Sequence, residues 1–288
     1  MSKAEDDAAE YYDNIWRAFV VWWEAEKTLG LHDGMYEKGV KSFEEAVYNL
    51  NEYVGKLLGL NNEKKMEILD AGCGVGGTSI YLAKKYQNVN FTGVTVSPVQ
   101  IKLAKNFAKE RHANNAKFIL KSYLNTGFPD SYFDGVFAIE SVCYAESKKD
   151  FIHEMNRVLK PGGKLVIISG IRTVEQLNPL MQKVYESWRN GRGKPDLPYI
   201  ESIKFYLKTE GFGEIDIRDI SKNMVRSQFR GFMIGLPYVV SSTFKRILKF
   251  GKYDPTKDPD YFLAVSSFGP ILGLSKSFQY DAIKATKK

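Results

Sequence analysis

The sequence predicts an α/β fold in which short buried strands alternate with helices around one largely parallel sheet. Three observations support this prediction. Apolar runs of strand length, such as residues 89–96 and 135–139, are each followed by a helical pattern. A glycine-rich turn follows the first such run, where residues 67–70 lead into four glycines within six positions. The chain of 288 residues is long enough for one such domain with further segments around it.

The elements are expected in the following order along the chain. The acidic residues 1–10 are expected to fray. Apolar residues at helical spacing predict helices over 11–26, 42–58, 78–86, 98–111, 151–159, 180–188 and 200–209. Runs rich in β-branched and aromatic residues predict strands over 67–70, 89–96, 117–121, 135–139, 164–169, 214–220 and 277–285. Pro98 is expected at the first position of its helix, where its fixed φ is favourable.

The glycine-rich turn is the strongest local signal for a binding site. Glycine permits positive φ, so the backbone can turn tightly and bring bare amides close to a ligand. These amides and the N-terminus of the next helix attract an anionic group. An ordinary tight connection is the alternative interpretation. The spacing of Gly72, Gly74, Gly76 and Gly77 after Asp70 resembles the cofactor loop of class I S-adenosylmethionine (SAM) methyltransferases.

This resemblance implies a Rossmann-like sheet of seven strands with helices on both faces, with SAM as cofactor and S-adenosylhomocysteine (SAH) as product. It also implies a mainly helical cap built from the N-terminus and two insertions. We expect N-terminal lid helices over 1–58, a SAM-binding core over 59–170, a cap insertion over 171–198, core again over 199–221, a larger cap insertion over 222–275 and a final core strand within 276–288.

Aromatic residues are concentrated in the predicted N-terminal helix, which holds three of the four tryptophans. A core-facing stripe and a lid over an apolar acceptor both explain this pattern. The motifs Tyr11-Tyr12-Asp13, Trp22-Trp23 and His32-x-Gly34 resemble the N-terminal segment of sterol and related C-methyltransferases, which closes over the donor. With the aromatic residues of the larger insertion, the residues expected to contact the substrate are Tyr12, Trp16, Trp22, Trp23, His32, Phe232 and Tyr238.

The second and third strands end in residues that depart from the common methyltransferase pattern. Gly93-x-Thr95-x-Ser97-x-x-Gln100 resembles cyclopropane-lipid synthases and terpene or sterol C-methyltransferases, in which the Thr and Gln hold the ribose. Ser122 stands where the family usually has an Asp that contacts the adenine amino group. The expected cofactor-binding residues are Asp70, Gly72, Gly74, Gly76, Thr95, Val96, Gln100, Ser122, Tyr123 and Glu140.

The fourth strand ends at Glu140, and ligands of open α/β sheets lie beyond the carboxyl ends of the strands. Glu140-Ser141-x-x-Tyr144 resembles the matching segment of geranyl diphosphate C-methyltransferase, and Ala138-Ile139-Glu140 resembles that of sterol C-methyltransferases. An alkene that takes a methyl group becomes a cation, which aromatic faces stabilise and a carboxylate deprotonates. Glu140 and Tyr144 are therefore the expected catalytic residues. The alternative is that Glu140 binds a hydroxyl or amide of the cap.

The favoured function is SAM-dependent methylation of a carbon atom of a hydrophobic isoprenoid or sterol-like molecule. Ring methylation of a quinone or tocopherol and N-methylation of a small amine are the alternatives within the enzyme class. A non-enzymatic SAM-binding protein is the alternative outside it. Nucleic-acid methylation is disfavoured, because the Asn/Asp-Pro-Pro-Tyr type of motif is absent after the fourth strand.

The composition also predicts the cellular compartment of the protein and its partners. Cys73, Cys143 and the three histidines have no metal-ligand spacing, so we expect reduced thiols and no metal. No cleavable signal or membrane-spanning apolar run is found, which predicts a soluble cytoplasmic protein. Residues 222–275 carry eight Lys or Arg against three Asp, and many aromatic residues. This excess fits the outside of an apolar pocket, a peripheral membrane contact or nucleic-acid binding. A diphosphate acceptor with magnesium would also need some of these side chains to point inward. The sequence leaves the oligomeric state open.

Overall fold

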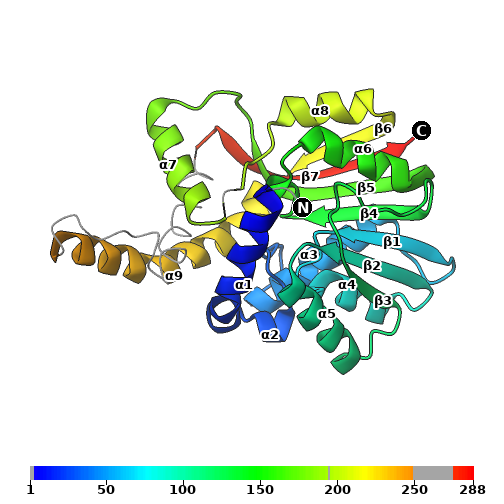
Figure 1. Cartoon of the computed structure of the whole chain (residues 1–288), viewed down its shortest axis with the longest axis horizontal. Coiled ribbons are helices and arrows are strands. Elements are labelled where there is room, and N and C mark those ends of the chain that lie inside the picture. The colour runs from blue at the N-terminus through cyan, green and yellow to red at the C-terminus, as the bar shows by residue number, and fades with distance from the viewer. Residues whose placement is uncertain (1–2, 194, 249–274) are drawn as a thin grey trace.

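The structure is a computed structural model that describes residues 3–193, 195–248 and 275–288 (Figure 1). Its centre is a seven-stranded sheet in the order β3-β2-β1-β4-β5-β7-β6. The strands are β1 (Met66–Ala71), β2 (Val89–Thr95), β3 (Ala116–Leu120), β4 (Phe133–Ile139), β5 (Leu159–Arg172), β6 (Phe212–Asp219) and β7 (Phe278–Lys287). Neighbouring strands are parallel except β7, which is antiparallel to both β5 and β6. The predicted fold class is confirmed.

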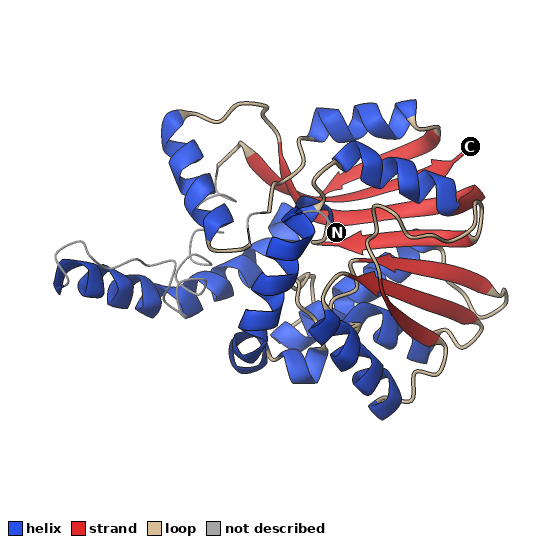
Figure 2. Cartoon of the chain, in the orientation of Figure 1, coloured by secondary structure: helices blue, strands red, loops and turns tan. Residues whose placement is uncertain are grey.

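Helices cover both faces of this sheet (Figure 2). They are α1 (Lys3–Trp23), α2 (Ala25–Thr28), α3 (Phe43–Leu58), α4 (Gly77–Lys85), α5 (Pro98–Glu110), α6 (Lys148–Val158), α7 (Pro179–Asn190), α8 (Ile200–Thr209), α9 (Ser221–Leu248) and the short 3₁₀ helix η1 (Val142–Tyr144). Adjacent strand residues alternate between two apolar cores: Ile68 packs with α3, α4 and α5, whereas Leu69 packs with α6 and α8. Both neighbours are fully buried, which explains why the strand reads as a continuous apolar run.

The carboxyl ends of β1 and β4 lie side by side at the point where the strand order reverses. The loop that follows β4 contacts the end of β1 directly, since Ser141 Oγ donates a hydrogen bond to the carbonyl oxygen of Ala71 at 2.6 Å. Gly72 has φ of +93°, and an added Cβ there would lie 2.4 Å from Cβ of Ser141. A side chain at position 72 is therefore excluded, and the sheet keeps an open crevice at this edge.

The expected fraying of residues 1–10 is wrong for the described part of this segment. Helix α1 begins at Lys3 and crosses the carboxyl ends of the central strands (Figure 1). Ala8 and Ala9 are buried, and Glu5 accepts a hydrogen bond from Ser122. These contacts with residues far away in the sequence hold the acidic segment in place, and the sequence pattern alone did not indicate them.

Helix α9 occupies the first half of the predicted larger insertion. Its first turn is tied to the sheet, because the backbone N–H of Tyr280 donates to Ser221 Oγ at 2.8 Å. Its second half runs outward past the other described elements (Figure 1). Residues 249–274, the rest of the predicted insertion, lie outside the described residues. Within the described ranges, no helix combines the length and the apolar character that crossing a membrane requires.

Candidate active site

Two adjoining cavities lie at the carboxyl edge of the sheet. The first, which we call the loop cleft, holds about 890 Å³ of empty space, part of it open to solvent, and is bounded by the glycine-rich turn, the ends of β2 and β4, and α1. The second, the aromatic chamber, holds about 1100 Å³ of empty space, part of it open to solvent, and lies between α1, the loop after α7, α9 and β7. Glu140, Tyr12, Leu31 and Tyr144 line both cavities and therefore form their common boundary.

The loop cleft contains most of the residues expected to bind the cofactor. Those that line it are Asp70, Gly72, Gly74, Thr95, Val96, Gln100, Tyr123 and Glu140. The hydroxyl of Thr95 donates to Gln100 Oε1 at 2.7 Å, so these two side chains lie together at the end of β2. Burial raises the pKa of Asp70 to about 7, although a hydrogen bond of 2.7 Å from Ser79 Oγ lowers it in part.

The aromatic chamber combines rings with three charged side chains. The rings belong to Tyr11, Tyr12, Phe19, Trp23, Tyr144, Trp188, Phe278 and Tyr280. The charged side chains are Asp33, Glu140 and Arg192, and Arg192 is the one Lys or Arg among the described lining residues. A chamber of this composition suits a largely apolar molecule, and it offers carboxylates at a defined place.

Glu140 is held in an unusual position at the boundary. Its φ is +50°, in the left-handed region that residues other than glycine rarely occupy. The backbone N–H of Asp33 donates to Glu140 Oε1 at 2.8 Å, and the hydroxyl of Tyr280 donates to the same oxygen. Burial and the nearby Glu140 raise the pKa of Tyr280, so its hydroxyl keeps the proton that it donates. Segments far apart in the sequence thus converge on one carboxylate oxygen.

Asp33 is a second carboxyl group of the chamber. Burial and the negative charge of Glu140 raise its pKa to about 7, against the opposing influence of Arg192 and Ser227. Ser227 Oγ of α9 donates to Asp33 Oδ1 at 2.9 Å, while the backbone N–H of Gly34 donates to Ser227 Oγ at 3.0 Å. The chamber therefore contains two neighbouring carboxyl groups, one of which titrates near neutral pH.

A chain of hydroxyl groups closes the boundary from the side of α1. The hydroxyl of Tyr12 donates to the hydroxyl of Tyr144 at 3.3 Å, which in turn donates to the carbonyl oxygen of Arg192 at 2.9 Å. The two tyrosine rings meet edge to face, with centroids 5.6 Å apart. This contact joins α1, η1 and the loop after α7, so the wall between the cavities depends on all three.

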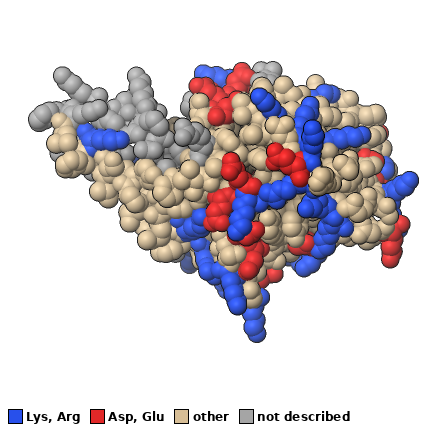
Figure 3. All heavy atoms as spheres, turned by 90° about the horizontal axis from the view of Figure 1, so that it is seen from below, with Lys and Arg blue, Asp and Glu red and all other residues tan. Residues whose placement is uncertain are grey.

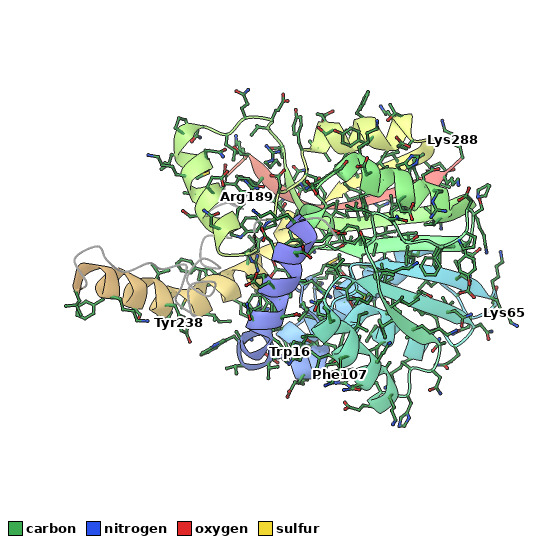
Figure 4. The ribbon with its side chains drawn as sticks, in the orientation of Figure 1. Trp16, Lys65, Phe107, Arg189, Tyr238 and Lys288 are labelled. Atoms are coloured by element: carbon green, nitrogen blue, oxygen red, sulfur yellow. The ribbon has the colours of Figure 1, made fainter. Side chains whose placement is uncertain are left out.

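Several residues expected at the site lie elsewhere in the structure. Gly76 and Ser122 line neither cavity, and Trp16 packs against Phe107 of α5 with ring centroids 6.1 Å apart (Figure 4). The rings of Trp22 and Tyr238 meet edge to face, with centroids 6.2 Å apart, and both residues line a shallow hollow on the outer surface.

Phe232 and His32 are also placed differently from the expectation. Phe232 stacks on Phe229 of the same helix and is not among the residues lining either cavity. His32 lines the loop cleft rather than the aromatic chamber, with its ring 3.4 Å from the hydroxyl of Thr78. Burial lowers the pKa of His32. Of the residues expected to contact the substrate, the structure brings Tyr12 and Trp23 to the chamber.

The polar residues of the two cavities that sequence reasoning missed include Glu5, Asp33, Arg192 and Tyr280. Asp33 lies inside the quoted His32-x-Gly34 motif, so its position was an available signal. Tyr280 lies in the last predicted strand, over 277–285. Glu5 and Arg192 lie in segments without any such signal.

Comparison with known proteins agrees with this geometry. A family model described as a methyltransferase domain matches residues 69–167, which cover the glycine-rich turn through β5. The chain contains a class I, SAM-dependent methyltransferase domain. The expected family resemblance and the expected cofactor are thereby confirmed.

Curated relatives extend the similarity beyond this domain. Norajmaline N-methyltransferase of Rauvolfia serpentina is 31% identical over 202 residues, which cover 64% of this chain and 66% of that protein. Sterol 24-C-methyltransferase of Kluyveromyces lactis is 28% identical over 195 residues, which cover 67% of this chain and 52% of that protein. The matches thus span between half and two thirds of these two relatives.

A solved structure shows the same fold. Geranyl diphosphate C-methyltransferase from Streptomyces coelicolor superimposes with a TM-score of 0.76 and 17% identity, covering 100% of this chain and 99% of that one. At this identity the similarity concerns the fold, including the helical segments around the methyltransferase core.

The chemical groups that line the loop cleft fit those of SAM. Gly72 and Gly74 turn bare backbone towards the cleft, which suits the methionine part of the molecule. The Asp70 carboxyl group is a partner for a cationic group, and Thr95 and Gln100 offer polar atoms for ribose hydroxyls.

The raised pKa of Asp70 predicts an unusual pH dependence of stability. An Asp in an unfolded chain ionises near pH 3.9, whereas Asp70 in the folded protein keeps its proton up to about pH 7. The stability that this group contributes is present below about pH 4 and is lost as the pH rises towards 7. Asp70→Asn cannot ionise, so the variant should become more stable relative to the wild type between about pH 5 and pH 7.5.

Urea unfolding at both pH values measures this difference in the absence of ligand. Asp6→Asn, which removes an exposed carboxyl group, is the control for net charge. If the stability difference between Asp70→Asn and the wild type is the same at both pH values, Asp70 does not titrate in this range.

Proposed function

We propose that this protein transfers a methyl group from SAM to a carbon atom of a hydrophobic isoprenoid or sterol-like molecule held in the aromatic chamber. The observation that supports this most is the position of Glu140, which lines both the loop cleft and the chamber. A carboxylate at that boundary is beside the place where a methyl group would pass from one cavity to the other.

SAM, when bound, supplies a methyl group on a positively charged sulfur. The residues proposed to hold it are those that line the loop cleft, with Gly72 and Gly74 at the methionine part and Thr95 and Gln100 at the ribose. The contribution of the chain to this step is alignment and the exclusion of water. Helix α1 supports both, because it forms part of the lining of each cavity.

The chamber supplies what an alkene acceptor needs after it has gained the methyl group. The acceptor then carries a positive charge, which the faces of Tyr12 and Tyr144 at the boundary stabilise. Glu140 removes a proton from the neighbouring carbon of the acceptor, and the electrons of that C–H bond form the new double bond. The hydrogen bonds from Asp33 and Tyr280 keep the carboxylate aimed at this boundary.

The charges around the chamber favour an acceptor without a diphosphate group. Arg192 shares the chamber with Asp33 and Glu140, so the described lining carries no excess of positive charge. Arg226 and Arg230 of α9 lie over aromatic rings instead, Arg230 at 4.4 Å from the ring centroid of Phe43. A diphosphate binds best where several Lys or Arg converge, and these two guanidinium groups are engaged elsewhere.

N-methylation of an amine is the second candidate, and the pair of carboxyl groups favours it. Asp33 and Glu140 would attract an ammonium group, and Asp33, with a pKa of about 7, could accept its proton near neutral pH. The relative from Rauvolfia serpentina is named an N-methyltransferase.

Helix α9 offers a route for an acceptor that comes from a lipid surface. Its large exposed apolar residues follow one helical face, and they are Val225, Phe229, Met233, Leu236, Val240, Phe244 and Leu248. The part of α9 visible in Figure 3 carries mostly uncharged side chains, while Lys and Arg gather on the body of the molecule. We infer that this face of α9 rests on the membrane from which the acceptor is drawn.

Sedimentation with phosphatidylcholine vesicles, with and without phosphatidylserine, tests the membrane contact. Phe244→Glu should reduce the bound fraction several-fold, because a charge would have to enter the interface. Phe205→Glu on α8 is the matched control, since both side chains are 61% exposed and the charge change is the same. Equal binding of both variants would place the contact elsewhere, and no binding of the wild type would refute it.

The role of Glu140 predicts the behaviour of Glu140→Gln. The amide keeps nearly the same volume, and its oxygen can still accept from Asp33 and Tyr280, but it cannot take up a proton. Turnover should fall by about a hundredfold or more, the scale of a lost general base, while SAH affinity stays near that of the wild type.

Product formation from methyl-labelled SAM and isothermal titration with SAH give the two quantities. Glu146→Gln, an exposed neighbour with the same chemical change, should behave like the wild type in both. Near-normal turnover of Glu140→Gln with an unchanged product would show that the base is another group or that the acceptor atom never becomes a cation.

A further inference from the structure

The residue that follows β3 does not itself enter the loop cleft. Ser122 is absent from the lining, and its hydroxyl donates to Glu5 Oε1 while accepting from the backbone N–H of Leu124 at 3.0 Å. Glu5, at the start of α1, lines the cleft and is only 7% exposed. The cleft therefore receives a carboxyl group at this edge of the sheet, and that group comes from the N-terminal helix.

The strand order indicates which part of SAM lies beside Glu5. The methyl group has to face Glu140 and the chamber, which lie after β4 on one side of β1. The cleft extends from there past the ends of β1 and β2, and β3 lies at the edge of the sheet beyond them. Since the sulfur joins the methionine part to the adenosine part, the adenine is the group that reaches the end of β3.

The face of α1 beside Glu5 is shaped for a flat ring. Glu5, Ala8, Ala9 and Tyr12 line the cleft together, at the spacing of one helical face. The two alanines leave space next to the helix, and the carboxylate of Glu5 offers acceptor atoms and no donor. The amino group of adenine is a donor, so the two groups are complementary.

We propose that Glu5 accepts a hydrogen bond from the exocyclic amino group of the adenine of SAM, so that helix α1 recognises the base. A second contact fixes the same helix near the ribose, because Ser97 donates its hydroxyl hydrogen bond to Asp13. Helix α1 also carries Tyr12, Phe19 and Trp23 of the aromatic chamber. Recognition of the adenine thereby helps to close the chamber over the acceptor. The proposal rests on SAM as the donor of the proposed function.

The test compares SAH with S-inosylhomocysteine, which has a carbonyl oxygen in place of the amino group. Isothermal titration of the full chain gives both dissociation constants. The wild type should prefer SAH, because the carbonyl oxygen would face the Glu5 carboxylate. In Glu5→Gln the preference should fall by about tenfold or more, since the amide can donate to that oxygen.

Two further variants complete the experiment. Glu10→Gln, an exposed residue of the same helix, should keep the wild-type preference. Ser122→Ala removes the hydroxyl that holds Glu5 and should lower the preference in part; it takes the place of Glu5→Gln if that variant does not fold. An equal loss of affinity for both ligands would mean that Glu5 only fixes α1, and an unchanged preference would exclude contact with the base. A wild type that binds neither ligand would refute the SAM assignment itself.

Discussion

The arrangement of this site depends on how one carboxylate oxygen is held. Glu140 Oε1 accepts hydrogen bonds from the backbone of Asp33 and the hydroxyl of Tyr280, which come from the N-terminal region and the last strand. The left-handed backbone of Glu140 costs about 1–3 kcal/mol, and these two bonds offset part of that cost. Because the same residue lines both cavities, the contact that fixes Glu140 also fixes where the cleft ends and the chamber begins.

Several segments of the chain form the aromatic chamber together, and contacts between these segments hold it in shape. Helix α1, the loop after α7, α9 and β7 each provide part of the lining, and contacts such as Tyr12 to Tyr144 and Ser227 to Asp33 join them. Under the proposed function, an acceptor in the chamber contacts the rings that line it, and these rings help to exclude water from the boundary at which the charge would develop. Under the proposed function, contacts with these segments determine which acceptor is bound, while the loop cleft holds the cofactor.

The sheet and the loop cleft could be predicted because their signals are local. The spacing of apolar residues, the composition of the strands and the spacing of the glycines predicted where the strands lie. The cleft residues from Asp70 to Gln100 were predicted because they lie in the turns that follow these strands. Glu5 and Arg192 could not be derived in this way, because each enters a cavity through contacts with residues far away in the chain. For the same reason Trp16 and Trp22 were expected at the substrate, although the first packs on α5 and the second lies on the outer surface.

The central claim is that the acceptor atom is carbon and that its charge is removed by loss of a proton. It is tested most directly by supplying SAM with a ¹³C-labelled methyl group together with isoprenoids, sterols, quinones and amines, and by locating the label in the product by NMR. We expect the labelled methyl group on a new carbon–carbon bond, and the loss of a hydrogen from the acceptor carbon that neighbours the methylated one. A label found on nitrogen or oxygen alone would contradict it.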